Sequence, residues 1–269
     1  MRIFVTGANG ILGRYVCKWL RVYRPKVHII KNTADITDIN EVQETVEKNY
    51  PLDMVIHLAA IVPVSKVQAK PELAYRVNVG GTINLLEAII QKKPKFVYCS
   101  SAHVYDYSEY PILEESPMAP QSIYGRTKMI AEMAATDIAK SFDIPLSIPR
   151  VFSIHDPAQT GTYLRPTLEK RLSTEDLSQP FKLIGAKSIR DILTAEEAAR
   201  RLVIVSLSSY LGKVNIGSGH GTKIEDFVQS LSYIDLDIEP VGQGNQLVAN
   251  IDRLIEIAGV ALFETKENI

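Results

Sequence analysis

The sequence predicts an α/β protein in which a parallel sheet is covered by helices on both faces. Short apolar runs rich in β-branched residues alternate with longer amphipathic segments from residue 1 to about residue 150, which is the pattern of strands joined by crossover helices. The runs are apolar at successive positions, as strands buried on both faces are. A glycine-rich turn at residues 7–13 separates the first run from the first amphipathic segment.

Strands and helices account in turn for this first part of the chain. The strands are expected at residues 2–6, 26–31, 54–58, 96–100 and 146–151, and the helices at 11–23, 39–49, 72–91 and 122–141. Asp38, followed three residues later by Glu41, predicts a capping box at the start of the second helix. Pro111, Pro117 and Pro120 indicate a loop before the fourth helix.

The alternation becomes less regular after residue 151. Helices are expected at 164–172 and 195–207, strands at 181–184 and 213–216, and weak helical patterns beyond residue 222. We therefore expect a first domain at 1–151, joined by about 191–217 from the second half of the chain. The remainder of 152–269 is expected to form a small C-terminal lobe.

Length and charge limit the classes of function. At 269 residues, 46% of them hydrophobic, the chain can bury a sizeable core. Its 30 Lys and Arg residues nearly balance 31 Asp and Glu residues, and the formal net charge is -1. This balance does not predict binding to nucleic acid or to an anionic membrane. A basic pocket for one phosphorylated ligand stays open.

Cysteine use and hydropathy indicate a cytoplasmic protein. Cys17 and Cys99 stand in apolar surroundings, so two buried thiols are expected instead of a disulfide or a metal site. No stretch approaches 18 consecutive apolar residues, so no membrane span is expected. The apolar run before Gly7 is too short for a signal peptide.

Gly7, Gly10 and Gly13 follow the first strand and open the first helix. The first glycine permits a tight turn, the second lets the backbone approach a pyrophosphate, and the third allows close packing of helix on sheet. The helix N-terminus then offers free N–H groups to the phosphates. A turn without a ligand is the alternative, but the order of strand, turn and helix favours a dinucleotide site.

With its G-x-x-G-x-x-G spacing, the sequence resembles the extended short-chain dehydrogenase/reductase family, whose signature is T-G-x-x-G-x-x-G. Further segments carry the resemblance in the expected order up to about residue 219. They are Asp35-Ile36-Thr37-Asp38, His57-Leu58-Ala59-Ala60, Asn78-Val79-Gly80-Gly81-Thr82, Ser100-Ser101-Ala102-His103-Val104-Tyr105, Tyr124-Gly125-Arg126-Thr127-Lys128, Arg190-Asp191 and Asn215-Ile216-Gly217-Ser218-Gly219. The resemblance implies a Rossmann-type, doubly wound sheet with a C-terminal substrate lobe.

The resemblance also implies the cofactor-binding residues. They are Gly7, Asn9, Gly10, Ile11, Leu12, Gly13, Lys31, Asp35, Ile36, Leu58, Ala59, Ala60, Asn78, Tyr124 and Lys128. Asp38 is explained as a helix N-cap, so Asp35 is the candidate for the adenine amino group. The second strand ends without a carboxylate to accept from a ribose 2′-hydroxyl. Lys31, helped by Arg14, favours NADP over NAD, although Lys31 can also be a solvated strand end.

Tyr124 and Lys128 are at positions i and i+4 of an expected helix and share one face. A nearby ammonium favours the phenolate of a tyrosine, whose ordinary pKa is about 10. An ordinary amphipathic pair is the alternative. Ser101 follows a strand end, where parallel sheets bind ligands, and it matches the family position better than Ser100. The resemblance implies that Tyr124 is the general acid, that Ser101 polarises a carbonyl and that Lys128 holds the nicotinamide ribose.

Many members of the family act on nucleotide-diphosphate sugars. The resemblance implies that Arg190 contacts substrate phosphates, a task that suits a guanidinium, although an ion pair with Asp191 is the alternative. His103, Tyr105 and Ser153 are expected to line the sugar site. The sequence departs from the family pattern where Ser153 replaces an asparagine, Asp156 replaces a glycine and Asp106 follows Tyr105 instead of glycine.

A 4-keto-6-deoxy-sugar reductase is the favoured function, because the lobe is short and the second strand lacks a terminal carboxylate. The alternatives are a 4-epimerase with retained NAD, a reductase of a non-sugar ketone, and a non-catalytic NADP-binding regulatory protein. Many relatives are homodimers with a four-helix bundle at the interface. Here the 72–91 and 122–141 helices would form it, and Ile130, Met133 and Ala134 fit such a face or an internal core.

Overall fold

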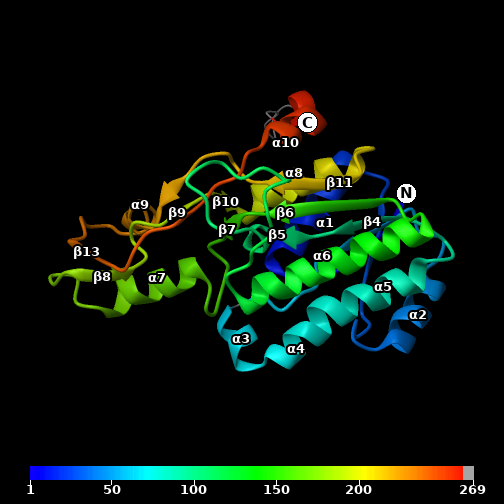
Figure 1. Ribbon diagram of the computed structural model, residues 1–269, viewed down its shortest axis with the longest axis horizontal. Coiled ribbons are helices and arrows are strands. Elements are labelled where there is room, and N and C mark those ends of the chain that lie inside the picture. Colours follow the sequence, from blue (N-terminus) through cyan, green and yellow to red (C-terminus); the bar gives the residue numbers. More distant parts are fainter. Residues whose placement is uncertain (63, 263–269) are drawn as a thin grey trace.

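The computed structural model describes residues 1–62 and 64–262, and it contains the predicted parallel sheet (Figure 1). The strand order is β11-β6-β4-β3-β1-β2, with β5 also paired to β6, and every one of these pairs is parallel. The strands are β1 (Arg2–Thr6), β2 (His28–Lys31), β3 (Met54–His57), β4 (Lys95–Tyr98), β5 (Ser100–Ser101), β6 (Leu146–Val151) and β11 (Gly212–Ile216). The expected fold class is confirmed.

Helices cover both faces of this sheet and bury two separate apolar clusters. On one face, Trp19 and Leu20 of α1 (Ile11–Tyr23) pack with Leu202 of α8 (Ala195–Leu207). On the other face, Val42 of α2 (Ile39–Lys48) and Leu85 of α5 (Gly81–Ile89) pack with residues of α6 (Ile123–Phe142). In the C-terminal part, α10 (Asp252–Ala258) and a 3₁₀ helix (Gly259–Leu262) complete the first cluster.

The strand order reverses beside β1, because β2 lies on one side of it and β3 on the other. Connections therefore leave β1 and β3 toward opposite faces of the sheet, an arrangement that forms a crevice at the carboxyl ends of the strands in open α/β sheets. Open α/β sheets bind ligands at such a point. The glycine turn follows β1 and the segment Leu58–Ala60 follows β3, so the fold brings two predicted cofactor segments together.

The single helix expected at 72–91 is instead divided into three parts. These are α4 (Pro71–Tyr75), a π-helical turn (Arg76–Gly80) and α5. The side chain of Asn78 is bonded to Ile61 and Thr127, and the hydroxyl of Thr82 donates to the Asn78 carbonyl oxygen at 2.7 Å. These contacts accompany the widened turn, and π-helical turns are frequent at functional sites. A short helix, α3 (Val64–Ala69), was not expected.

The start of α2 differs from the expected capping box. Asp38 is the N-cap as predicted, since its carboxylate accepts from Asn40 N at 2.9 Å and Glu41 N at 3.3 Å. Glu41 does not complete the box, because its carboxylate accepts from the backbone N–H of Asp35 at 2.9 Å. Glu41 therefore fixes the turn before the helix.

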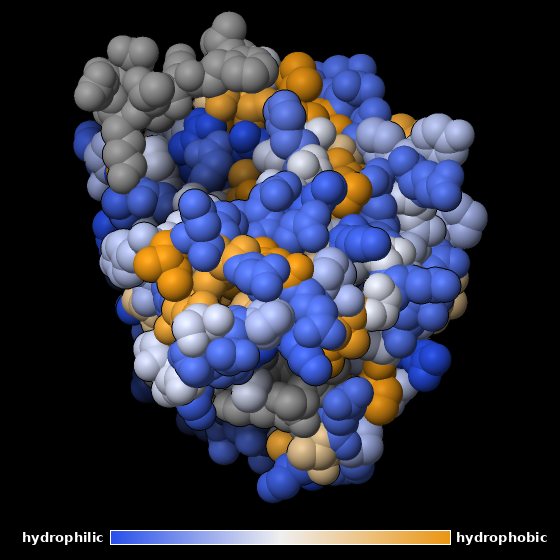
Figure 2. Space-filling model, turned by 90° about the vertical axis from the view of Figure 1, so that its left-hand side faces the viewer, coloured by the Kyte–Doolittle hydropathy of each residue, from blue (hydrophilic) through white to orange (hydrophobic). Residues whose placement is uncertain are grey.

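The C-terminal lobe has its own apolar cluster, which includes Leu168, Phe181 and Phe227. It contains β7 (Ser153–His155), α7 (Leu164–Thr174), β8 (Phe181–Ile184), β9 (Ile189–Arg190), β10 (Ile192–Thr194), β12 (Thr222–Lys223), α9 (Ile224–Gln229), β13 (Ile238–Val241) and β14 (Gln246–Leu247). The tail therefore adds strands where only helical patterns were expected. Figure 2 looks onto the end of this lobe, where hydrophilic residues surround scattered apolar ones.

The expectations on membrane crossing, cysteines and metal binding can be compared with the structure. Across the described parts of the chain, no helix has the length and apolar character that crossing a membrane requires. Cys17 and Cys99 are both free and buried. Within residues 1–62 and 64–262, no cluster of three or more His, Cys, Asp or Glu side chains could hold a metal ion.

Candidate active site

The glycine turn has the geometry of a phosphate cradle. Gly7 has a φ of +65°, and a Cβ there would lie 2.7 Å from the backbone nitrogen of Ala59. A Cβ on Gly13 would lie 2.8 Å from Ala8 Cα and closer still to the Gly7 carbonyl oxygen. Gly10 begins α1 in extended conformation and has no side chain to cap the helix. The loop can therefore approach a pyrophosphate closely and offer it the first N–H groups of α1.

Thr6 supports this cradle from below. Its hydroxyl oxygen accepts from Leu58 N at 3.2 Å and Ala59 N at 3.1 Å, and it is bonded to the ring of buried His57. These contacts hold the segment after β3 against the end of β1. The sequence marked His57 as part of a motif, but its supporting role depends on contacts between distant segments.

Asp35 and Ile36 lie beside this crevice and differ in exposure. The sequence assigned a structural role to Asp38 alone, but Asp35 has one as well. Its carboxylate accepts from both the N–H and the hydroxyl of Thr37 at 2.9 Å. These hydrogen bonds lower the pKa of Asp35. Ile36 is buried, and its side chain fills the space where a Cβ on Gly81 would stand.

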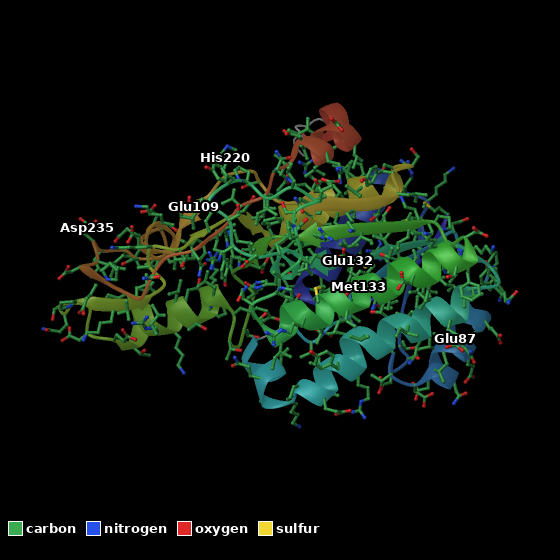
Figure 3. The ribbon with its side chains drawn as sticks, viewed as in Figure 1. Glu87, Glu109, Glu132, Met133, His220 and Asp235 are labelled. Carbon is green, nitrogen blue, oxygen red and sulfur yellow. The ribbon has the colours of Figure 1, made fainter. Side chains whose placement is uncertain are left out.

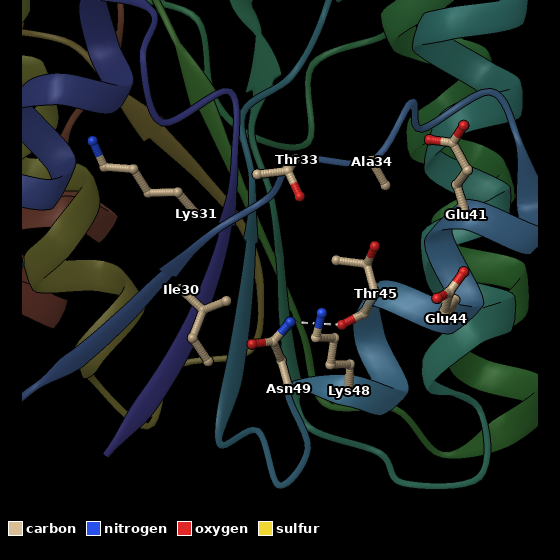
Figure 4. A pocket seen from close by; sticks show the side chains of 9 residues that line it. All are labelled: Ile30, Lys31, Thr33, Ala34, Glu41, Glu44, Thr45, Lys48 and Asn49. Carbon is tan, nitrogen blue, oxygen red and sulfur yellow. Dashed lines mark hydrogen bonds between the residues drawn. The ribbon is translucent and has the colours of Figure 1, made fainter.

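Lys31 ends β2 next to the glycine turn, and its ammonium donates to the side-chain oxygen of Asn9 at 3.3 Å. It borders an open depression between β2 and α2 (Figure 4). In that view Lys31 points away from Glu41 and Glu44 on the other side of the depression. The positive group therefore faces the glycine turn, with exposed Arg14 on the following helix.

Asn78, predicted to bind the cofactor, has its side-chain amide engaged by the protein itself. Its oxygen accepts from Ile61 N at 2.8 Å, and its nitrogen donates to Ile61 O at 3.1 Å and to the hydroxyl of Thr127 at 2.9 Å. The side chain is 1% exposed. Asn78 thus clamps the segment after β3 to α6, and this use of its amide differs from the expected one.

Ser101, Tyr124 and Lys128 are brought together at the end of β5 and the start of α6. The hydroxyl of Ser101 lies near enough to the Tyr124 hydroxyl to lower the pKa of the phenol. Ser122 fixes the start of α6 by accepting from Gly125 N at 3.0 Å. Ser100, the competing serine, bonds instead to Glu132 at 2.8 Å. The structure therefore pairs Ser101 with Tyr124.

Burial shifts the pKa values of Tyr124 and Lys128, which lie one turn apart on α6. It raises the pKa of Tyr124 above its ordinary value, and Ser101 opposes that change. It also lowers the pKa of Lys128 to about 8, although Cys99 and Glu132 raise it. The Lys128 ammonium lies 4.3 Å from the centre of the Tyr98 ring. Contrary to expectation, Ser101 and not Lys128 is the neighbour that lowers the pKa of Tyr124 in this structure.

His103 lies beside Tyr124, and Arg190 is close enough to His103 to act on its pKa. The His103 ring is exposed and stands edge-on to the Tyr124 ring at 5.7 Å. Surrounding protein atoms and, secondarily, the Arg190 charge lower the pKa of His103 to about 4. His103 is therefore neutral at pH 7.

Arg190 does not form the alternative ion pair with Asp191. Its guanidinium donates to the carbonyl oxygens of Ile189 and Asn245 at 2.8 and 2.9 Å and lies 5.4 Å from the Tyr107 ring centre. Asp191 is buried and accepts from backbone N–H groups of the 218–219 turn. Arg190 is thus held in a fixed orientation by Asn245.

The sugar-site prediction for Tyr105 is wrong. Tyr105 is 2% exposed, its hydroxyl donates to Asn215 Oδ1 at 2.7 Å, and it accepts from Arg150 Nη1 at 2.7 Å. The burial of that hydroxyl among fixed partners makes Tyr105 a structural residue. Ser153 is half-buried in β7, and its N–H donates to the Asp191 carbonyl oxygen at 3.1 Å.

The loop that leads into α7 contributes a residue that the sequence did not single out. Residues 160–163 and 60–62 together line a pocket of about 250 Å³. Tyr163 belongs to this lining, and its phenol is near enough to Tyr124 to raise the pKa of that residue. Buried Asp156 of the same loop lies near Tyr15 of α1 and raises the pKa of its phenol. No spacing rule links Tyr163 to Tyr124, so only the fold reveals it.

Known proteins resemble this chain over most of its length. It is 29% identical over 201 residues to UDP-glucose 4-epimerase 2 of Arabidopsis thaliana, a match that covers 65% of this chain and 57% of the relative. It is 27% identical over 270 residues to GDP-6-deoxy-D-talose 4-dehydrogenase of Aggregatibacter actinomycetemcomitans, covering 96% of this chain and 88% of the relative.

A solved structure has the same fold. The UDP-glucose 4-epimerase of Thermus thermophilus in complex with NAD superimposes with a TM-score of 0.80 at 22% identity, over 95% of this chain and 92% of that one. Residues 3–217 match the model of the NAD dependent epimerase/dehydratase family. This match agrees with the predicted resemblance to extended short-chain dehydrogenases/reductases. The chain belongs to the NAD dependent epimerase/dehydratase family.

Proposed function

We propose that the chain is an NAD(P)-dependent oxidoreductase that acts on a carbonyl or hydroxyl carbon of a nucleotide-diphosphate sugar. The proximity of the Ser101 and Tyr124 hydroxyls, with Lys128 one helical turn further on, carries this proposal. It places a proton donor and a second hydroxyl donor at the same point, beside the crevice that contains the glycine turn. The favoured reaction is reduction of a 4-keto-6-deoxy sugar.

The residues of the chain divide the work of this reaction. The dinucleotide, when bound at Gly7–Gly13, supplies or accepts a hydride at the sugar carbon. Tyr124 gives a proton to the carbonyl oxygen during reduction and removes it in the reverse direction. Ser101 donates to the same oxygen and stabilises its developing negative charge. Lys128 would hold the nicotinamide ribose with its buried ammonium. Tyr163, on the loop that leads into α7, lies near Tyr124 and would help to exclude water.

The proposal that the substrate is a nucleotide sugar rests on His103 and the groups around it. Arg190 is oriented by Asn245 and is available to a phosphate on its remaining face. His103 is neutral, so its ring can donate a hydrogen bond to a sugar hydroxyl or accept one from it. Relatives named for UDP-glucose and for GDP-6-deoxy-D-talose support this substrate class.

Replacement of Tyr124 by Phe tests the function. The variant should bind NADPH with nearly wild-type Kd and lose turnover, because the hydroxyl alone is removed. Substrate is found beforehand by measuring thermal shifts with UDP, dTDP and GDP, with and without NADPH. Retained turnover in Tyr124→Phe would refute the assignment.

A 4-epimerase is the second candidate, and the similarity to a UDP-glucose 4-epimerase favours it. The two reactions differ in stoichiometry. A reductase consumes one added NADPH for each sugar, and the absorbance of NADPH falls. An epimerase interconverts two sugars without net consumption of added cofactor.

We propose NADP as the preferred cofactor, because Lys31 carries a positive charge next to the glycine turn and a 2′-phosphate would pair with it. Titration with NADH and NADPH tests this preference. A lower Kd for NADPH in the wild type, lost in Lys31→Ala, is the expected result. Equal Kd values for the two cofactors in the wild type would contradict it.

We also propose a homodimer formed through the outer face of α4 to α6. Ile130 and Met133 of α6 are 38% and 51% exposed, and Tyr75 at the end of α4 is 37% exposed. Met133 lies on α6 next to Glu132, which is buried against the sheet (Figure 3). A second copy would cover these apolar groups.

A further inference from the structure

Glu132 is the most deeply buried carboxylate near the reacting residues. It is 1% exposed and forms an ion pair with Arg150, whose side chain is fully buried. Glu132 lies on α6 one turn beyond Lys128 and two turns beyond Tyr124, on the side of the helix that faces the sheet (Figure 3). The reaction described above uses Ser101, Tyr124 and Lys128 but gives Glu132 no role.

Arg150 bonds to both oxygens of the carboxylate, and Ser100 bonds to one of them. Its Oε2 accepts from Ser100 Oγ at 2.8 Å and from Arg150 Nε at 3.0 Å, and its Oε1 accepts from Arg150 Nη2. Arg150 uses its other donors on Tyr105, the Glu114 carbonyl oxygen and the Met118 sulfur. The guanidinium is therefore saturated, and the carboxylate cannot turn away without leaving a buried charge unpaired.

Ser100 transmits this anchoring to the reacting set. It precedes Ser101 directly, and the two residues pair with Arg150 and Val151 of β6. Ser100 is thus held to α6 at Glu132, and the next residue meets α6 at Tyr124. The hydrogen bond from Ser100 to α6 therefore leaves little freedom for the adjacent Ser101 to move away from Tyr124.

Glu132 also acts on Lys128. Among the described residues, no carboxylate forms an ion pair with Lys128. Glu132 acts on its ammonium through space and raises its pKa against the effect of burial. The other groups that face Lys128 are Tyr98 at the end of β4, Cys99 directly after that strand, and His57 of β3.

We infer that Glu132 is a positioning residue for the proposed reaction: it anchors Ser101 through Ser100, and it is the buried negative charge behind Lys128. The inference rests on the proposed function for its kinetic consequence. Its effect on the ionisation of Lys128 depends on the fold alone.

Ser100→Ala tests the anchor without disturbing the Glu132–Arg150 pair. We expect kcat to fall about tenfold, because a small displacement of a donor costs rate steeply. KM for the sugar and Kd for NADPH should not change, and Lys128 should titrate as in the wild type. Wild-type kcat in a folded Ser100→Ala variant would overturn the anchoring role.

Glu132→Gln tests the charge. The Cε resonance of Lys128, identified by its loss in Lys128→Met, is followed by NMR as pH is raised. We expect its midpoint to fall below that of the wild type, because the neighbouring negative charge is lost. Glu175→Gln, which removes a carboxylate from the pair with Arg171 on α7, is the control and should leave the midpoint unchanged.

Arg150 is left unpaired in Glu132→Gln, so this variant can fail to fold. The double replacement Glu132→Leu with Arg150→Met removes both charges and keeps apolar groups of similar volume, which buried ion pairs often tolerate. A folded double variant with an unchanged Lys128 midpoint and wild-type kcat would overturn the inference. If the wild type turns over no nucleotide sugar, the proposed function fails, while the titration still decides the role of Glu132.

Discussion

The hydroxyl of Thr6 lies 2.6 Å from Nδ1 of His57 and joins the ends of β1 and β3 where the strand order reverses. The other ring nitrogen of His57 lies 3.0 Å from the hydroxyl of Thr82. Thr82 donates its proton to the Asn78 carbonyl oxygen, so its oxygen accepts from Nε2–H of His57. Thr6 consequently donates to Nδ1, and His57 is a neutral ring with both nitrogens satisfied.

This arrangement predicts a loss of stability in acid. Burial, together with the Lys128 charge, lowers the pKa of His57 from 6.5 to about 3. The unfolded chain takes up a proton below pH 6.5 and the native ring does not, so stability falls as pH decreases from 6.5 toward 3. The contribution is about 1.4 kcal/mol for each pH unit. Urea unfolding between pH 4 and 6.5 should show a shallower slope in His57→Gln.

Exposed His220 supplies the control for that measurement (Figure 3). His220→Gln removes an imidazole without touching the core and should keep the wild-type slope. Equal slopes in His57→Gln and the wild type would contradict the neutral, buried state of His57.

Gly13→Ala should abolish dinucleotide binding. The new methyl group would stand 2.8 Å from Ala8 Cα and still closer to the Gly7 carbonyl oxygen, so the turn that approaches the pyrophosphate must open. Gly80→Ala is the matched control, because a Cβ there meets no atom within 4 Å. Isothermal titration with NADPH should show lost binding for Gly13→Ala and wild-type Kd for Gly80→Ala. Tight binding by a folded Gly13→Ala variant would exclude this turn as the cradle.

The parts of the fold that depend on local patterns were predictable from the sequence. The bounds of β1 and α1 agree with the expected 2–6 and 11–23, because a strand, a glycine turn and an amphipathic helix each have a local signal. The π-helical turn at Arg76–Gly80 was not predictable. Its side-chain contacts join Asn78 to Ile61 and Thr127, which are separated from it by 17 and 49 positions.

The candidate site likewise has a part that was predictable from the sequence and a part that was not. Ser101 and Tyr124 could be placed together, since one follows a strand end and the other begins the next long helix. Tyr105 was misplaced because Arg150 and Asn215, which are 45 and 110 positions away, draw its hydroxyl into the interior. His57 and Tyr163 obtain their roles from distant partners in the same manner. Motif spacing identifies residue types, while burial decides which groups remain free for a ligand.

Lys128→Met should stabilise the protein while removing activity. Burial lowers the pKa of Lys128 from 10.5 to about 8, so holding this ammonium destabilises the native state at neutral pH. The cost is full below pH 8, where both states are protonated, and it disappears as pH rises toward 10.5. Urea unfolding at pH 7 should show a gain of roughly 3 kcal/mol, and at pH 10 most of that gain should be absent.

An equal gain at pH 7 and pH 10 would mean that packing of the methionine, and not removal of a buried charge, stabilises the variant. No gain at either pH would mean that the Lys128 ammonium is solvated or paired in solution. Lys48→Met on α2 is the control, since Lys48 is exposed and its replacement should leave stability nearly unchanged.

Met133→Glu should convert the proposed homodimer to monomers. Met133 is 51% exposed on the outer face of α6, and a carboxylate placed between two copies would have to be buried without a partner. Leu211→Glu is the matched control, because Leu211 is also 51% exposed but lies before β11, outside that face. Sedimentation velocity should give twice the chain mass of 29.9 kDa for the wild type and for Leu211→Glu, and 29.9 kDa for Met133→Glu. A monomeric wild type would remove the proposed interface, and a dimeric Met133→Glu variant would place it on another face.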